Sequence, residues 1–223
     1  MTMLQRMLDL TALKLAILAL ATAGFASIHH AHAGAQAEVA LSASVQASLQ
    51  AAISDRAAPK SVFLSRLDEH VWIYEMSGRL AKKIPDPITR TEFLRTVHYE
   101  ASRAGLDPEV VLGLIQVESN FRKYAVSSVG ARGFMQVMPF WQKLIGSADQ
   151  NLFHLRTNLR FGCTILRHYL DIERGDYYRA LGRYNGSLGK PEYPNLVLAS
   201  WNGSFRYERS KIAAVVGPAN AGN

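Results

Sequence analysis

A carboxylic acid lies on an apolar helical stripe in the middle of this chain. In residues 107–121 (DPEVVLGLIQVESNF), Val111, Leu114 and Ile115 follow the spacing of one helix face, and the next position on that face is Glu118. A carboxyl group withdrawn from water resists ionisation, so its pKa rises and it keeps a proton near neutral pH. The pattern therefore predicts either a general acid or a structural acid satisfied by a buried arginine or backbone amides.

The segment that follows favours the general acid. Residues 125–139 (AVSSVGARGFMQVMP) combine polar and small side chains before a proline, which is typical of a shaped loop that leads into a helix. Gly130 and Gly133 permit tight turns and the close approach of a ligand. Ser127 and Gln136 supply a hydroxyl and an amide, the kind of groups that orient a ligand in a mostly apolar cleft.

Three motifs together resemble the soluble lytic transglycosylases, relatives of goose-type lysozyme that cleave peptidoglycan. They are ESNF at 118–121, SSVGARGFMQVMP at 127–139 and RYNGS at 183–187. The resemblance covers about residues 84–197 and implies an all-α, lysozyme-like (goose-type) domain with a substrate cleft. It departs from the family at Gly186 and Ser187, which replace the usual Ala-Gly after the Tyr-Asn pair.

The resemblance also implies roles for individual residues. Glu118 matches the family's sole catalytic acid and base, which cleaves the β-1,4 bond between N-acetylmuramic acid and N-acetylglucosamine. The sugar's own C6 hydroxyl then closes on the anomeric carbon to give a 1,6-anhydro product. The family's substrate-binding and positioning groups match Ser127, Met135, Gln136, Tyr184 and Asn185. The resemblance implies no cofactor and no metal.

A single-acid mechanism agrees with the other acidic residues. The usual glycosidase needs a second carboxylate, and the sequence contexts of the candidates predict loops, helix surfaces and caps: Asp149, Asp171, Glu173 and Asp176. Three alternatives remain open from the sequence. They are a hydrolytic muramidase, a non-catalytic peptidoglycan-binding module and a basic exported interaction protein.

The first 33 residues predict an export signal. Arg6 and Lys14 precede an apolar run at residues 15–28, and Ala31 to Ala33 fit a small-residue cleavage pattern. The run is shorter than the roughly 20 residues of a spanning helix, so stable membrane insertion is not expected. We therefore expect cleavage after Ala33 and a soluble periplasmic protein.

The charge balance favours a polyanionic partner. The 223 residues carry a formal net charge of +7, which suits nucleic acid, anionic membranes and bacterial walls alike. Lysines and arginines do not cluster with interleaved aromatic residues, so nucleic acid is not favoured. Export makes peptidoglycan the expected partner.

Cysteine and histidine indicate no metal chemistry. Cys163 is the only cysteine, and its apolar neighbours predict a buried small hydrophobe. His154 and His168 lie in separate segments without the spacing of metal ligands.

The domain organisation follows from helical periodicity. We expect a signal peptide at 1–33, an Ala/Ser/Gln-rich linker or marginal helix at 34–60, a helical domain at 61–207 and a tail at 208–223. Within the domain, helices are expected at 62–83 (one or two), 89–104, 108–121, 138–145, 155–172, 177–184 and 194–201.

Overall fold

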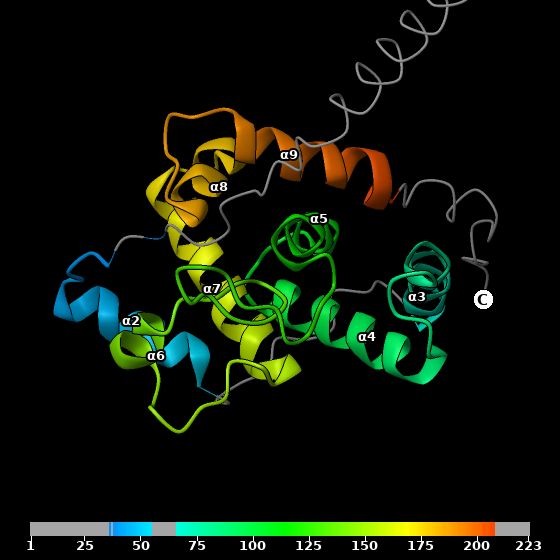
Figure 1. Ribbon diagram of the computed structural model, residues 1–223, viewed down its shortest axis with the longest axis horizontal. Coiled ribbons are helices and arrows are strands. Elements are labelled where there is room, and N and C mark those ends of the chain that lie inside the picture. The colour runs from blue at the N-terminus through cyan, green and yellow to red at the C-terminus, as the bar shows by residue number, and fades with distance from the viewer. Residues whose placement is uncertain (1–35, 37, 55–65, 208–223) are drawn as a thin grey trace, which may run out of the picture. The chain divides into compact units, whose positions relative to one another are not determined.

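Figure 1 shows the computed structural model, which describes residue 36 and residues 38–54 and 66–207. Contacts divide the chain into two units, Met1–Ala31 and His32–Asn223, and every described residue belongs to the second. The expected signal peptide and C-terminal tail lie outside the described residues. None of the helices in the described ranges has the length and apolar character needed to cross a membrane.

The described part is built from helices and their connections. In chain order these are α2 (Ala43–Ile53), α3 (Arg66–Leu80), α4 (Pro87–Arg103), α5 (Pro108–Ser119), α6 (Phe140–Ile145), α7 (Leu155–Ile172), α8 (Tyr177–Asn185), α9 (Glu192–Ser200) and the π-helical turn η1 (Trp201–Phe205). Extended pairing in these ranges is limited to the isolated bridges Val126 to Arg132 and Arg132 to Val137. The all-α fold predicted from the sequence is confirmed.

Local capping explains where several helices begin. The side chains of Asp86, Asp107 and Asp176 accept hydrogen bonds from backbone N–H groups in the first turns of α4, α5 and α8, at 2.7, 2.8 and 3.1 Å. Pro87 and Pro108 occupy the first turns of α4 and α5, where a missing N–H costs nothing. Helix α4 therefore begins two residues before the predicted Thr89. The undecided segment 34–60 contains a helix, α2, with Ser42 as its cap.

Helix α5 is the central element, and it is buried on nearly every side. It packs against α4, α9 and η1. Gly113 allows α9 to approach, because a Cβ there would lie 3.1 Å from the carbonyl oxygen of Val197 and 3.0 Å from the amide nitrogen of Trp201. In the last turn of α5, Glu118 and Ser119 are buried, whereas Gln116 and Val117 are half-buried.

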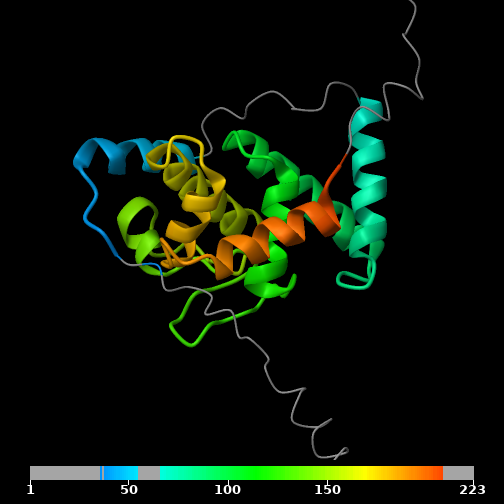
Figure 2. The same ribbon diagram turned by 90° about the horizontal axis from the view of Figure 1, so that it is seen from above.

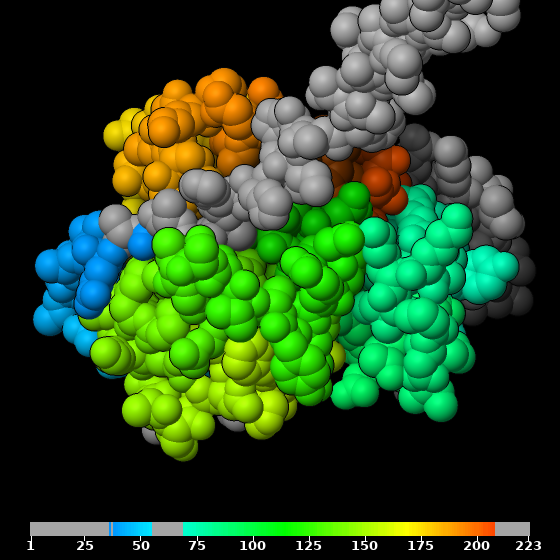
Figure 3. All heavy atoms as spheres, in the orientation of Figure 1, coloured from blue at the N-terminus to red at the C-terminus, as the bar shows by residue number. Residues whose placement is uncertain are grey.

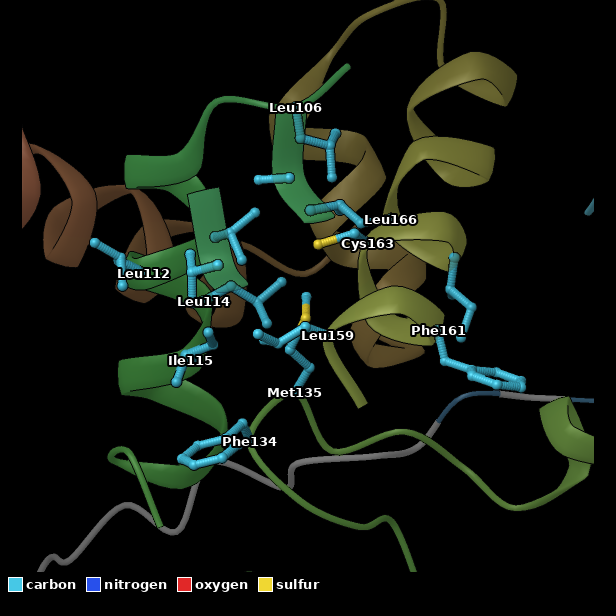
Figure 4. Close-up of a cluster of buried hydrophobic side chains, with 14 of the residues drawn as sticks. Leu106, Leu112, Leu114, Ile115, Phe134, Met135, Leu159, Phe161, Cys163 and Leu166 are labelled. Carbon is cyan, nitrogen blue, oxygen red and sulfur yellow. The ribbon is translucent and has the colours of Figure 1, made fainter. Parts of the chain in front are cut away.

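The core joins α5 to α7 and to the segment between α5 and α6. Figure 4 shows Leu114, Leu159 and Met135 pointing toward one another, with Cys163 beside them. Cys163 is a free, buried cysteine, and burial raises its pKa well above the ordinary value. Its predicted role as a small hydrophobe is confirmed.

Candidate active site

Glu118 lies in the last turn of α5, where the helix ends abruptly. Asn120 caps the helix in the left-handed conformation at φ 49°, and Phe121 continues in that region at φ 63°. Val111, Leu114 and Ile115 are fully buried, as the stripe predicted, and Glu118 is only 6 % exposed. The acid therefore points inward.

Among the described residues, the carboxyl group of Glu118 has one hydrogen-bond partner, and one of its two oxygens has none. The Tyr193 hydroxyl donates to Oε1 at 2.5 Å, whereas Oε2 is buried and accepts no hydrogen bond from any described residue. Burial raises the pKa of Glu118 to about 8, and the Tyr193 hydrogen bond opposes that rise. Because Oε1 already accepts a proton donor, the proton of the neutral acid falls on Oε2. This is the protonated, unengaged oxygen that a general acid needs.

Tyr193 was missed by the sequence analysis. It lies in the first turn of α9, 75 positions after Glu118, and is buried. The sequence predicted a helix that begins one residue later, at Pro194, and gave no role to Tyr193. Nothing in the local sequence pointed to Glu118, because the contact depends on α9 packing against α5.

Tyr184 contacts the loop backbone instead of Glu118. Its hydroxyl donates to the carbonyl oxygen of Met135 at 2.7 Å. Burial, followed by the nearby charge of Glu118, raises the pKa of Tyr184 well above the ordinary value. The two predicted residues Tyr184 and Met135 are thus brought together, and Glu118 lies close enough to act on Tyr184 electrostatically.

The loop that carries Met135 is fixed by amide side chains. Gln136 Nε2 donates to the carbonyl oxygens of Ala125 and Gly133, at 3.1 and 2.9 Å, and Gln136 itself has φ 47°. Asn158 on α7 accepts from the Met135 amide at 2.8 Å. The sequence analysis did not single out Asn158. These bonds hold the loop backbone against α7 and thereby fix the carbonyl that Tyr184 binds.

Comparison with known proteins places this arrangement in a family. Residues 95–193 match the family model for the transglycosylase SLT domain, a range that includes Glu118 and ends at Tyr193. This stretch is a transglycosylase SLT domain. The predicted resemblance is therefore confirmed, and the matched range lies within the expected domain at 61–207.

Curated relatives carry the same kind of name. The chain is 31 % identical over 118 residues to a transglycosylase of Enterobacteria phage PRD1, covering 50 % of this chain and 43 % of that one. It is 46 % identical over 48 residues to the membrane-bound lytic murein transglycosylase C of Actinobacillus pleuropneumoniae serotype 5b (strain L20), covering 22 % and 13 %. The corresponding protein of Mannheimia succiniciproducens is 35 % identical over 65 residues, covering 29 % and 16 %. The chain thus spans less than half the length of these relatives.

The remaining predicted residues of the SLT domain bind their own neighbours. Ser127 Oγ accepts from the Ala131 amide at 3.0 Å in a half-buried turn, and Figure 3 shows atoms of the segment between α5 and α6 (green) on the front face. Asn185 Nδ2 donates to Ser187 Oγ at 3.0 Å. Asn185 Oδ1 is buried and, within the described ranges, has no hydrogen-bond partner. Like Glu118 Oε2, it is a buried acceptor left open beside the SLT motifs.

The described residues of the domain contain no group of three or more histidine, cysteine or acidic side chains placed to hold a metal ion. His154 forms the N-cap of α7 without a side-chain hydrogen bond to the helix.

Proposed function

We propose that the protein is a lytic transglycosylase that cleaves the β-1,4 bond between N-acetylmuramic acid and N-acetylglucosamine in peptidoglycan. The observation that carries this proposal is the state of Glu118 inside the SLT domain: a buried acid, pKa about 8, with Oε2 unpartnered among the described residues. Such a group is protonated at neutral pH and has a proton to give.

In the proposed reaction Glu118 acts twice. Its proton passes from Oε2 to the oxygen of the glycosidic bond, the bond from that oxygen to the anomeric carbon breaks, and positive charge develops on the sugar ring. The C6 hydroxyl of the same sugar attacks the anomeric carbon, and the Glu118 carboxylate takes the hydroxyl proton. The products are a 1,6-anhydro end and a free hydroxyl end, and Glu118 regains its starting state without consuming water.

The influences on the pKa of Glu118 support a single-acid mechanism. They are burial and the Tyr193 hydrogen bond, and none of the described carboxylates is among them. A two-carboxylate glycosidase places its acids close enough to act on each other. In this scheme Tyr193 is a positioning residue that holds Oε1 and stabilises the carboxylate formed after the first proton transfer.

We assign the remaining residues to the substrate and to the loop beside it. Asn185 offers an open buried acceptor for a sugar hydroxyl or N-acetyl N–H. Ser127 and Met135 would contact the glycan from the loop, and Tyr184 holds the Met135 backbone. Gln136 has its Nε2 hydrogens directed to the loop, so substrate contact would fall to its Oε1.

The proposed setting is the periplasm, after removal of residues 1–33 as a signal peptide. The sequence pattern at the N-terminus and the net charge of +7 support it, since an exported basic protein suits an anionic wall. Fractionation of cells that express the full chain tests this point, and a mature N-terminus at Gly34 is the expected result.

Digestion of purified sacculi tests the activity. The soluble muropeptides are analysed by mass spectrometry, and 1,6-anhydro ends are expected from the wild type. Glu118→Gln keeps the shape of the neutral acid and removes its proton, so it should lose cleavage by about 10²-fold or more while still sedimenting with sacculi. Reducing ends in place of anhydro ends would identify a hydrolytic muramidase, and binding without cleavage by the wild type would identify a wall-binding module.

A further inference from the structure

An open cavity of about 770 Å³ lies between α2, α4 and α7, away from the groups assigned to glycan cleavage. Helix α7 separates the two regions, because Leu159 and Cys163 face the core whereas Arg160, Thr164 and Arg167 line the cavity. Figure 2 shows α2 (blue) at the upper left and the segment between α5 and α6 (green) at the lower edge of the view. The cavity is therefore a separate feature of the unit.

The cavity exists because α2 presents small side chains to it. Leu49 and Ile53 anchor α2 in the hydrophobic core. Ser48, Ala51 and Ala52 line the cavity and are too short to fill it. On this side the cavity is thus lined by short, partly apolar side chains that leave room for a ligand.

Arginine supplies most of the charge around the cavity. Among the described residues that line it, Arg103, Arg160 and Arg167 are accompanied by two acids, Glu100 and Asp171. Glu100 is 1 % exposed and pairs with Arg160 in a bidentate contact, with Nη2 to Oε1 at 2.8 Å and Nε to Oε2 at 3.1 Å. Positive charge therefore exceeds negative charge by one among these lining residues.

Arg103 and Arg167 have more N–H groups than their hydrogen bonds to the described residues require. A guanidinium has five N–H groups. Arg103 donates to the carbonyl oxygens of Ala52 and Ser54 at the end of α2, both at 2.5 Å. Arg167 donates to Asp171 and to one backbone carbonyl. With respect to the described part of the chain, both arginines have N–H groups left for an oxyanion.

We propose that this cavity binds a small organic carboxylate with an aliphatic portion. Its carboxylate pairs with Arg103 and Arg167, which is the geometry that guanidinium groups favour. Its aliphatic portion lies against Val45, Leu49 and Ala51. The volume is in the range of small-molecule sites, about 300–1,000 Å³, and the combination of apolar wall and few charged groups is typical of them.

Binding has a consequence for α2. Arg103 holds the last carbonyl groups of α2, and the ligand would rest on the same helix and the same arginine. A helix of 11 residues is marginal by itself in water, so a ligand that bridges α2 to α4 and α7 slows its opening. Hydrogen exchange in α2 therefore reports occupancy independently of glycan cleavage.

The first experiment titrates the mature protein with octanoate, octanol and octylamine by calorimetry and follows hydrogen exchange in α2. Octanoate is expected to bind one to one and to slow exchange in α2, whereas octanol and octylamine bind about tenfold more weakly or not at all, because they cannot pair with the arginines. Equal binding of octanol or octylamine would overturn the charge argument. N-acetyl-leucine in place of octanoate distinguishes a peptide C-terminus from a fatty acid as the source of the carboxylate.

The second experiment uses matched variants of α2. Ala51→Phe fills the cavity and should weaken octanoate binding by about tenfold or more, whereas Ala47→Phe, on an exposed position of α2 outside the cavity, should leave it unchanged. Arg167→Gln should weaken binding without altering the wall of α2. Unchanged binding in both Ala51→Phe and Arg167→Gln would place octanoate elsewhere and refute the site. Glu118→Gln should bind octanoate as the wild type does, which keeps this result separate from the proposed cleavage.

Discussion

The buried acid makes a quantitative prediction about stability. Glu118 must lose its proton at high pH inside the folded protein, where burial opposes the charge. Glutamine has the shape of the neutral acid but never ionises. We therefore expect Glu118→Gln to lose cleavage by about 10²-fold or more and, near neutral pH, to be more stable than the wild type.

The magnitude follows from the two pKa values of Glu118. Its pKa rises from 4.5 to about 8 on folding. Between these values the unfolded chain releases a proton that the folded protein keeps, so the wild type loses stability as pH rises through this window. At pH 7 the loss is about 3 kcal/mol, from about 1.4 kcal/mol for each pH unit above 4.5. Below pH 4.5 both states hold the proton and the loss disappears.

Urea unfolding at pH 4 and pH 7 measures this effect. The free energy of unfolding of Glu118→Gln minus that of the wild type should be about 3 kcal/mol larger at pH 7 than at pH 4. Glu109, a second buried acid with pKa raised to about 8, is present in both proteins and cancels. Glu92→Gln, a change at an exposed acid, serves as the control and should show little pH-dependent difference. A pH-dependent gain for Glu118→Gln no larger than that of the control would refute the assignment of a buried, protonated acid.

Three further changes probe other contacts. Tyr193→Phe removes the hydrogen bond that lowers the pKa of Glu118, so the alkaline limb of the cleavage profile should move to higher pH; an unmoved limb in muropeptide release would contradict this role. Gly162→Ala would place a Cβ 2.4 Å from the Met135 sulfur and should lower the free energy of unfolding by about 1–3 kcal/mol in urea. A variant as stable as the wild type would contradict this prediction. Glu100→Gln removes the carboxylate that pairs with the buried guanidinium of Arg160 and should cost about 3–5 kcal/mol by the same measurement, and a neutral result would show that water reaches the pair.

Helix α3 lies outside the range of the family match but is bound to the domain that the match covers. Residues 95–193 form the SLT domain, and α3 precedes this range. Trp72 on α3 is fully buried and donates to Glu109 on α5 at 2.7 Å, and Arg79 donates to the carbonyl oxygens of Ser204 and Arg206. Helix α3 is thus fastened both to the central helix of the domain and to the segment that follows α9.

The sequence by itself determined the helices and the identity of the acid. Aspartate caps and first-turn prolines act within a few residues, so α4, α5 and α8 begin near the predicted positions. The apolar stripe on α5 placed Glu118 inward for the same reason, since helical periodicity is a local property. The SLT motifs are short and contiguous, and the family match confirms the family resemblance that they indicated.

Only the tertiary structure decided what touches the acid. Tyr193, and not Tyr184, donates to Glu118, because α9 packs on α5 while Tyr184 reaches the Met135 carbonyl. Gln136 directs its amide hydrogens into its own loop, which its polarity alone did not reveal. These contacts join residues separated by long stretches of chain, and they depend on how helices with similar apolar faces pack together. The sequence predicted the inward-facing acid Glu118, and the packing determined how that group is held.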